Sequence, residues 1–175
     1  MHRLPRDPRN FRELVEADLR RAARLIIKIQ DEIDPQFRIA TPEGDYCLAI
    51  TFPPGTDGRM EIFDKLALWM ASKQALAFTF ASELISPDSV YCAGIGLKER
   101  YGCIARITPE PRPWTAENFG AVEWLAASSI DPVIAGLLPK GAREISARDL
   151  EALEVWFGAM GEFPAVKLET GEIGL

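Results

Sequence analysis

Apolar residues recur with a helical period along the N-terminal part of the chain. Between Phe11 and Ile33 an apolar side chain returns at every third or fourth position, the spacing of one buried helix face. Asp7 is suited to the N-cap and Pro8 to the first helical position. The pattern predicts a long amphipathic helix over residues 7–34 that needs a partner surface.

Two later segments have the pattern of β-hairpins. In residues 36–52, the turn Pro42-Glu43-Gly44-Asp45 separates two short runs of strand-forming residues. In residues 89–108, a similar pair of runs is separated by Lys98-Glu99-Arg100. We therefore expect two antiparallel strand pairs.

Between the hairpins, the apolar stretch LALWMASKQALAFTF predicts the centre of a long helix over residues 58–85. Ser86-Pro87 would end this helix, because the residue before a proline disfavours helical geometry. Its apolar side chains cover more than half of the circumference, which is typical of a helix covered on two sides. The sheet is expected on one side, and the N-terminal helix or a second subunit on the other.

The C-terminal third predicts a helical segment over residues 115–160, followed by a strand or tail over 163–175. Thr115 is expected to cap a first short helix, and Asp131-Pro132 to start a second. Ser146 and Asp149 have the spacing of a capping box at the start of a third.

These elements predict an α+β fold in a single domain spanning residues 1–175. Its antiparallel sheet of two hairpins would be covered mainly on one face by helices, with a long N-terminal helix and a C-terminal helical segment. YCLAITFPP and YGCIARITPEP each precede a predicted helix that carries a tryptophan, Trp69 or Trp124. The chain therefore contains either a duplicated ββα unit or a coincidental likeness between two hairpin–helix pairs.

Charge changes the picture mainly at the N-terminus. The chain of 175 residues has a net charge of −6, yet residues 1–30 contain eight Arg or Lys and four Asp or Glu. An acidic body repels phosphates, so nucleic acid is not the expected partner. A small basic ridge on the first helix leaves weak nucleic-acid binding open. The ridge consists of Arg20, Arg21, Arg24 and Lys28.

Cysteine content and hydropathy indicate a soluble cytoplasmic protein. The three cysteines form an odd set, and the first thirty residues have no apolar run of the secretory type. The longest apolar segment is interrupted by charged residues that a membrane span tolerates poorly. We expect reduced thiols and no membrane association.

Catalytic chemistry is sparse. The single histidine is His2, so histidine-based triads and zinc sites are not expected. No phosphate-binding loop is visible, and no cofactor or metal is predicted. Glu83 and Asp88 bracket the Ser86-Pro87 corner, where a cleft could hold a cation, but two acids around a loop are common in proteins. The pattern favours a non-enzymatic protein.

The sharpest chemical feature is Lys73, which lies within the apolar arc of the predicted central helix. Asp18 is similarly placed on the apolar face of the first helix, so the two side chains would form a buried pair that sets the packing register. Alternatively, Lys73 extends along its stem to solvent, or its amine serves as a functional group in a pocket.

Three functions follow from these features. The first is a domain that binds another macromolecule, most simply a protein or a second copy of the chain. The second is a small-molecule-binding protein or enzyme with a pocket between sheet and central helix, using Lys73, Glu83 and Asp88. The third is weak nucleic-acid binding through the basic ridge.

Overall fold

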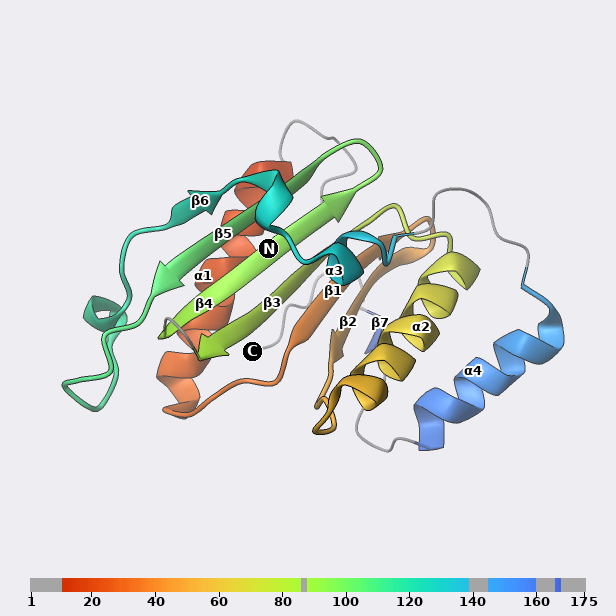
Figure 1. The fold of residues 1–175 in the computed structure, drawn as a ribbon, viewed down its shortest axis with the longest axis horizontal. Helices are drawn as coiled ribbons and strands as arrows, with labels where there is room; N and C mark the ends of the chain where they lie inside the picture. The colour runs from red at the N-terminus through yellow and green to blue at the C-terminus, as the bar shows by residue number, and fades with distance from the viewer. Residues whose placement is uncertain (1–10, 86–87, 139–144, 160–165, 168–175) are drawn as a thin grey trace.

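The computed structural model describes residues 11–85, 88–138, 145–159 and 166–167. A seven-stranded sheet forms the centre of this part of the chain, with the strand order β6-β5-β4-β3-β1-β2-β7 and antiparallel neighbours throughout (Figure 1). The strands are β1 (Gln36–Thr41), β2 (Gly44–Ala49), β3 (Ala77–Ile85), β4 (Asp88–Gly96), β5 (Arg100–Arg106), β6 (Glu123–Leu125) and β7 (Val166–Lys167).

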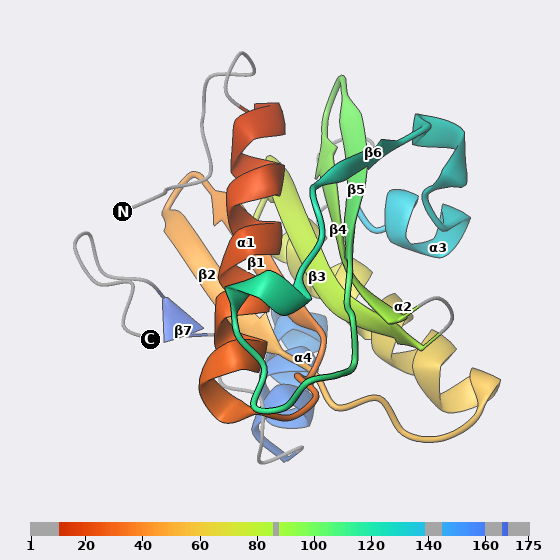
Figure 2. The same ribbon diagram turned by 90° about the vertical axis from the view of Figure 1, so that its left-hand side faces the viewer.

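Helices lie on both faces of this sheet. Helix α1 (Phe11–Ile29) covers one face, while α2 (Thr56–Ser72) and the short α3 (Pro132–Ala135) cover the other (Figure 2). Helix α4 (Ala147–Ala159) lies beside α2. The predicted α+β class, the two hairpins and the N-terminal helix are confirmed, although the helix ends at Ile29 rather than at residue 34. Its expected start at Asp7 and Pro8 lies outside the described residues. The prediction that helices lie mainly on one face is wrong, because the inner strands have apolar side chains on both faces.

The predicted central helix over 58–85 is two elements rather than one. Helix α2 ends at Ser72, and the Lys73 amide donates to the Trp69 carbonyl as the C-cap. Gln74 then takes a φ of 53°, which turns the chain out of the helix. The following residues form β3, which pairs with both β1 and β4.

The alternation of large and small side chains explains why residues 77–85 form a strand rather than continue the helix. In β3, Phe78 and Phe80 face α2, and the small Ala77, Thr79 and Ala81 face α1. This alternation has a period of two, as a strand requires. From the sequence of a short apolar run alone, a helix with a wide apolar face and a strand buried on both faces are hard to tell apart.

The predicted helical segment over 115–160 is also largely wrong. Thr115 caps only the 3₁₀ turn η2 (Ala116–Asn118), and after it the chain pairs along β5, so that Trp124 lies opposite Cys103. A second 3₁₀ turn, η3 (Ala127–Ser129), follows β6. Because Trp124 is on a strand and Trp69 is on a helix, the chain does not contain a duplicated ββα unit.

The helix starts expected further along are confirmed. Asp131 accepts a hydrogen bond from the Val133 amide at the start of α3. The Ser146 hydroxyl accepts one from the Asp149 amide, 3.1 Å away, before α4. Of the predicted segment 163–175, β7 adds a short strand beside β2, and the other residues lie outside the described part of the chain.

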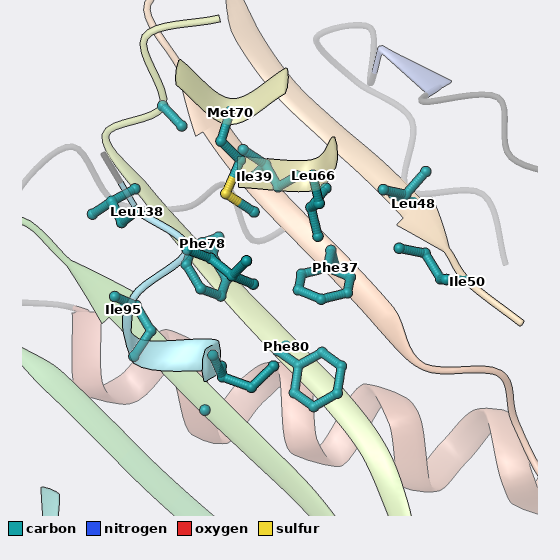
Figure 3. Packing of buried hydrophobic residues seen from close by; sticks show 14 of the residues in the cluster. Phe37, Ile39, Leu48, Ile50, Leu66, Met70, Phe78, Phe80, Ile95 and Leu138 are labelled. Atoms are coloured by element: carbon teal, nitrogen blue, oxygen red, sulfur yellow. The ribbon is translucent and has the colours of Figure 1, made fainter. Parts of the chain in front are cut away.

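Two apolar cores are separated by the sheet. The core on the α2 side is formed mainly by large aliphatic and aromatic side chains from the inner strands and α2 (Figure 3). The core on the α1 side contains smaller strand residues, among them Ala40, Ala81 and Cys92. This difference in size lets α1 lie close to the backbone of the sheet. Among the described residues, no helix is long and apolar enough to cross a membrane.

Gly94 lies on β4 directly under α1. A Cβ atom at this position would lie 2.1 Å from Val15 Cγ2 and 3.1 Å from Phe11 Cζ. Both contacts come from buried α1 side chains, so the helix itself would have to move away to make room.

We therefore expect Gly94→Ala to lower the free energy of unfolding by about 1–3 kcal/mol, the usual cost of overpacking a core. Urea unfolding of the purified chain measures this change. Gly120→Ala is the matched control, because its added Cβ would meet its nearest neighbour, the Arg106 carbonyl oxygen, at 3.6 Å. Equal stability of the two variants would contradict this account of the α1 packing.

Candidate functional site

A buried carboxylate lies between α1 and the sheet. Asp18 projects from the inner face of α1 and is only 1% exposed. Its Oδ2 accepts a hydrogen bond of 2.7 Å from the Thr79 hydroxyl, and its Oδ1 lies 3.3 Å from Arg38 Nη1 and from Arg21 Nε. Three donors from α1, β1 and β3 thus meet one carboxylate.

Arg38 is the central cation of this group. It is 3% exposed and lies on β1, opposite Thr79 on β3 and Cys47 on β2. Its Nη2 is 3.9 Å from Asp45 Oδ2, whereas its buried Nε has no hydrogen-bond partner among the described residues. We call Asp18, Arg21, Arg38, Asp45 and Thr79 the Asp18–Arg38 cluster.

The alternation of side chains between the two faces of each strand explains why these residues meet. On β1, Phe37 and Ile39 face α2, so Arg38 faces α1. On β3, Thr79 faces the same way between Phe78 and Phe80, and it pairs directly with Arg38. The cluster contains two guanidinium groups and two carboxylates, so its formal charges balance. Balanced and hydrogen-bonded charges are the form in which ions persist inside proteins.

The thiols beside this cluster are not activated for chemistry. Burial raises the pKa of Cys47, although Arg21 and Arg38 act in the opposite direction. Cys92 and Cys103 pair across β4 and β5, and burial raises the pKa of Cys92 strongly and that of Cys103 to about 12. A nucleophilic cysteine needs a lowered pKa, so these residues behave as small core side chains.

The predicted pair of Lys73 and Asp18 is wrong. Lys73 is half-buried at the end of α2, and its amine lies 5.9 Å from the centre of the Tyr46 ring. Tyr46 belongs to the core on the α2 side, and Asp18 lies under α1 on the opposite face of the sheet. Because α2 ends at Ser72 and Lys73 is its C-cap residue, the position belongs to a helix end, where a lysine reaches solvent at little cost.

Glu83 and Asp88 are brought near each other, but not near Lys73. Glu83 lies towards the end of β3 on the α1 side, and Asp88 begins β4 and acts on it electrostatically. Lys73 precedes the start of β3 on the other side of the sheet. The polar groups expected to line one pocket therefore do not converge. Within the part of the chain that is described, no three Asp, Glu, Cys or His side chains are grouped so that they could hold a metal ion.

The basic ridge is only partly as predicted. Arg20, Arg24 and Lys28 are exposed on the outer face of α1, and Arg20 pairs with Glu16 over 2.8 Å. Arg21 instead turns inwards to Asp18 and to the Gln36 side chain. From here on, the α1 ridge means Arg20, Arg24 and Lys28.

Arg38 and Thr79 were not among the residues singled out from the sequence. The sequence carries a usable signal for Arg38, because it interrupts the apolar run of Phe37, Ile39 and Ala40. A cation in a strand covered on both faces requires a carboxylate partner. The sequence gives no such signal for Thr79, because the helical pattern predicted for its segment places it on the polar side.

Comparison of the chain with protein-family models, with curated proteins and with solved structures gave no significant match. The candidate site therefore rests on its own geometry. That geometry gives the Asp18–Arg38 cluster a structural task, which is to join α1 to β1 and β3.

We expect Asp18→Asn to lower the free energy of unfolding by about 3–5 kcal/mol, because it leaves Arg38 buried without its nearest counter-charge. Chemical unfolding provides the measurement, and Glu13→Gln on the exposed side of α1 is the control.

The double variant Asp18→Leu/Arg38→Met should recover part of the stability that is lost in Asp18→Leu alone. A double variant whose losses simply add would show that the two side chains are not coupled.

Proposed function

We propose that this chain is a non-enzymatic domain that binds another protein, and that the α1 ridge is its contact surface. One observation carries the proposal: Arg24 and Lys28 are exposed, and neither has an ion-pair partner among the described residues. Unpaired cations in a row on a well-anchored helix suit an acidic segment of a partner.

The neighbourhood of α1 supports this proposal. Arg12 stacks on the Trp124 ring at 4.4 Å, and Tyr101 lies next to Trp124 with a ring-centre distance of 6.2 Å. Arginine, tryptophan and tyrosine are the side chains most enriched at the energetic centres of protein interfaces. The partly exposed Trp124 and Tyr101 would extend the contact beyond the ridge.

A second copy of the chain is one candidate partner. The outer side of α2 exposes Asp57, Glu61 and Asp64, which follow one another at helical spacing. This row on α2 is acidic, whereas the α1 ridge is basic. Exposed ion pairs contribute only about 0.2–1 kcal/mol each, so self-association through charge alone would be weak and sensitive to salt.

The alternatives have less support. An enzyme that uses Lys73 with Glu83 and Asp88 would need these groups in one pocket, and they lie on different faces of the sheet. A nucleic-acid role would rest on three cations near Glu13 and Glu16, which would oppose phosphates. We place the function in the cytoplasm, because Cys47, Cys92 and Cys103 are free thiols and a reducing compartment keeps them so.

The test compares three forms of the chain: wild type, the triple variant Arg20→Ala/Arg24→Ala/Lys28→Ala, and a control lacking three exposed cations elsewhere. The control is Arg59→Ala/Lys98→Ala/Arg100→Ala, which removes the same charge. Each form is used to capture proteins from native extract. Proteins that bind the wild type and the control but not the triple variant are then purified, and their affinity for each form is measured by titration.

We expect affinity for such a partner to fall roughly tenfold or more in the triple variant, which corresponds to about 1.4 kcal/mol, and to weaken with added salt. Self-association is followed by sedimentation of the same proteins. A ridge-dependent affinity for duplex or single-stranded oligonucleotides, with no protein partner, would show that the ridge serves nucleic acid instead.

A further inference from the structure

One edge of the sheet is open at β6. This strand is the last in the sheet order and pairs with β5 alone, so among the described residues no strand lies beyond it (Figure 1). An open edge presents backbone amides and carbonyls with which another chain can pair. Because β6 is only three residues long, a further strand would need side-chain contacts as well as backbone pairing to be held there.

The hydrogen bonds of β5 decide which backbone groups of β6 are already used. In an antiparallel sheet, successive residues of a strand bond alternately to the neighbour on one side and on the other. Just after β5, the Ile107 amide donates to the Asp88 carbonyl over 2.8 Å, so the odd-numbered residues here, Cys103 among them, bond to β4. The even-numbered residues bond the other way, as the Arg106 carbonyl does when it accepts from the Gly120 amide over 2.8 Å.

Trp124 therefore turns its backbone amide and carbonyl to the open edge. Its neighbours Glu123 and Leu125 lie opposite the even-numbered residues Ile104 and Gly102, so their backbone groups bond to β5. Trp124 lies between them and its backbone groups point the opposite way. Neither group has a backbone hydrogen-bond partner in the part of the chain that is described. The edge thus offers one donor and one acceptor at a defined position.

The side chains around this position differ between the two faces of the sheet. On the α1 side, the Arg12 guanidinium lies 4.4 Å from the centre of the Trp124 ring. Arg12 is exposed and has no ion-pair partner within the described ranges. On the other side, Leu125 packs against the core on the α2 side, and Glu123 is already paired with Arg106 over 3.3 Å. The unpaired charge at this edge is therefore positive and lies on the α1 side.

We propose that β6 receives an extended segment of the protein partner as an additional antiparallel strand, with an acidic residue opposite Trp124. This inference rests on the proposed function, because it specifies how a partner with an acidic segment would bind. The acidic residue and Trp124 would exchange two backbone hydrogen bonds. Its carboxylate would lie on the α1 side beside Arg12, because residues directly opposite each other on paired strands point to the same face.

Arg12 and Trp124 supply the selectivity that backbone pairing lacks. The backbone bonds of an added strand form with any extended segment, whereas side chains at alternate positions decide which segment is preferred. A carboxylate opposite Trp124 would neutralise Arg12, and a basic residue there would be repelled by it. Tryptophan and arginine are also the side chains that most often dominate the energy of protein interfaces.

The test uses a short blocked peptide, Ser-Val-Asp-Val-Ser, as a probe added to the full chain. One matched peptide carries lysine in place of aspartate, and another carries a methyl group on the aspartate nitrogen, which removes the donor to the Trp124 carbonyl. NMR titration should show the aspartate peptide binding roughly fivefold more tightly than the lysine peptide, the upper range for an exposed ion pair. The methylated peptide should bind more weakly than its parent.

Hydrogen exchange locates the added strand. With the aspartate peptide at saturation, the Trp124 amide should exchange roughly tenfold more slowly than in the free chain, because it gains a hydrogen-bond partner. The amides of Glu123 and Leu125 already bond to β5 and should change little. An unchanged Trp124 amide, or a methylated peptide that binds as well as its parent, would overturn the proposal.

A charge reversal tests the role of Arg12 directly. In Arg12→Glu the lysine peptide should bind more tightly than the aspartate peptide, which reverses the order found for the wild type. Arg59→Glu, an equal change of charge at an exposed position of α2, should keep the wild-type order. A peptide preference that Arg12→Glu leaves unchanged would show that Arg12 does not select the added strand.

The triple variant of the α1 ridge separates this inference from the proposed function. It keeps Arg12 and β6, so it should bind the aspartate peptide about as tightly as the wild type does. If the triple variant loses its protein partner while the peptide leaves Trp124 unaffected, the inference fails and the proposed function stands. If the peptide protects Trp124 but the triple variant keeps every partner, the α1 ridge is not the contact surface and the proposed function fails.

Discussion

The Asp18 carboxylate and the donors around it are the constraint on which the rest of the structure depends. A helix laid over a sheet can slide along it if only apolar surfaces meet. Asp18 removes this freedom, because its two oxygens bond to Arg38 on β1 and Thr79 on β3 while Arg21 closes the group from α1. Buried ionic groups of this kind set the register more than they add stability.

The unequal thickness of the two cores follows from the same arrangement. Large side chains such as Phe78 and Phe80 fill the space under α2, whereas alanine, glycine and threonine line the face under α1. The small residues let α1 approach until Gly94 touches Val15 and Phe11. At that distance, the Asp18 carboxylate can reach the short side chain of Thr79 and the buried guanidinium of Arg38.

Charge is treated in three different ways in this molecule. Inside the Asp18–Arg38 cluster, the formal charges of two guanidinium groups and two carboxylates balance. On the exposed side of α1, Arg24 and Lys28 have no ion-pair partner within the part of the chain that the structure describes. At Glu83, burial raises the pKa of the carboxyl to about 7.

Sequence periodicity alone determined the N-terminal helix, both hairpins, the helix starts at Asp131 and Ser146, and the antiparallel α+β class, because these depend on local spacing and turn chemistry. It also marked Asp18 as a misplaced charge on an apolar face. Only the tertiary structure decided that residues 77–85 form a strand, since a continuous apolar run suits a helix and a doubly covered strand equally well. It also decided which cation Asp18 meets. Arg38 is 20 residues away and Thr79 is 61, and a partnership over such separations arises from strand pairing, which no local pattern contains.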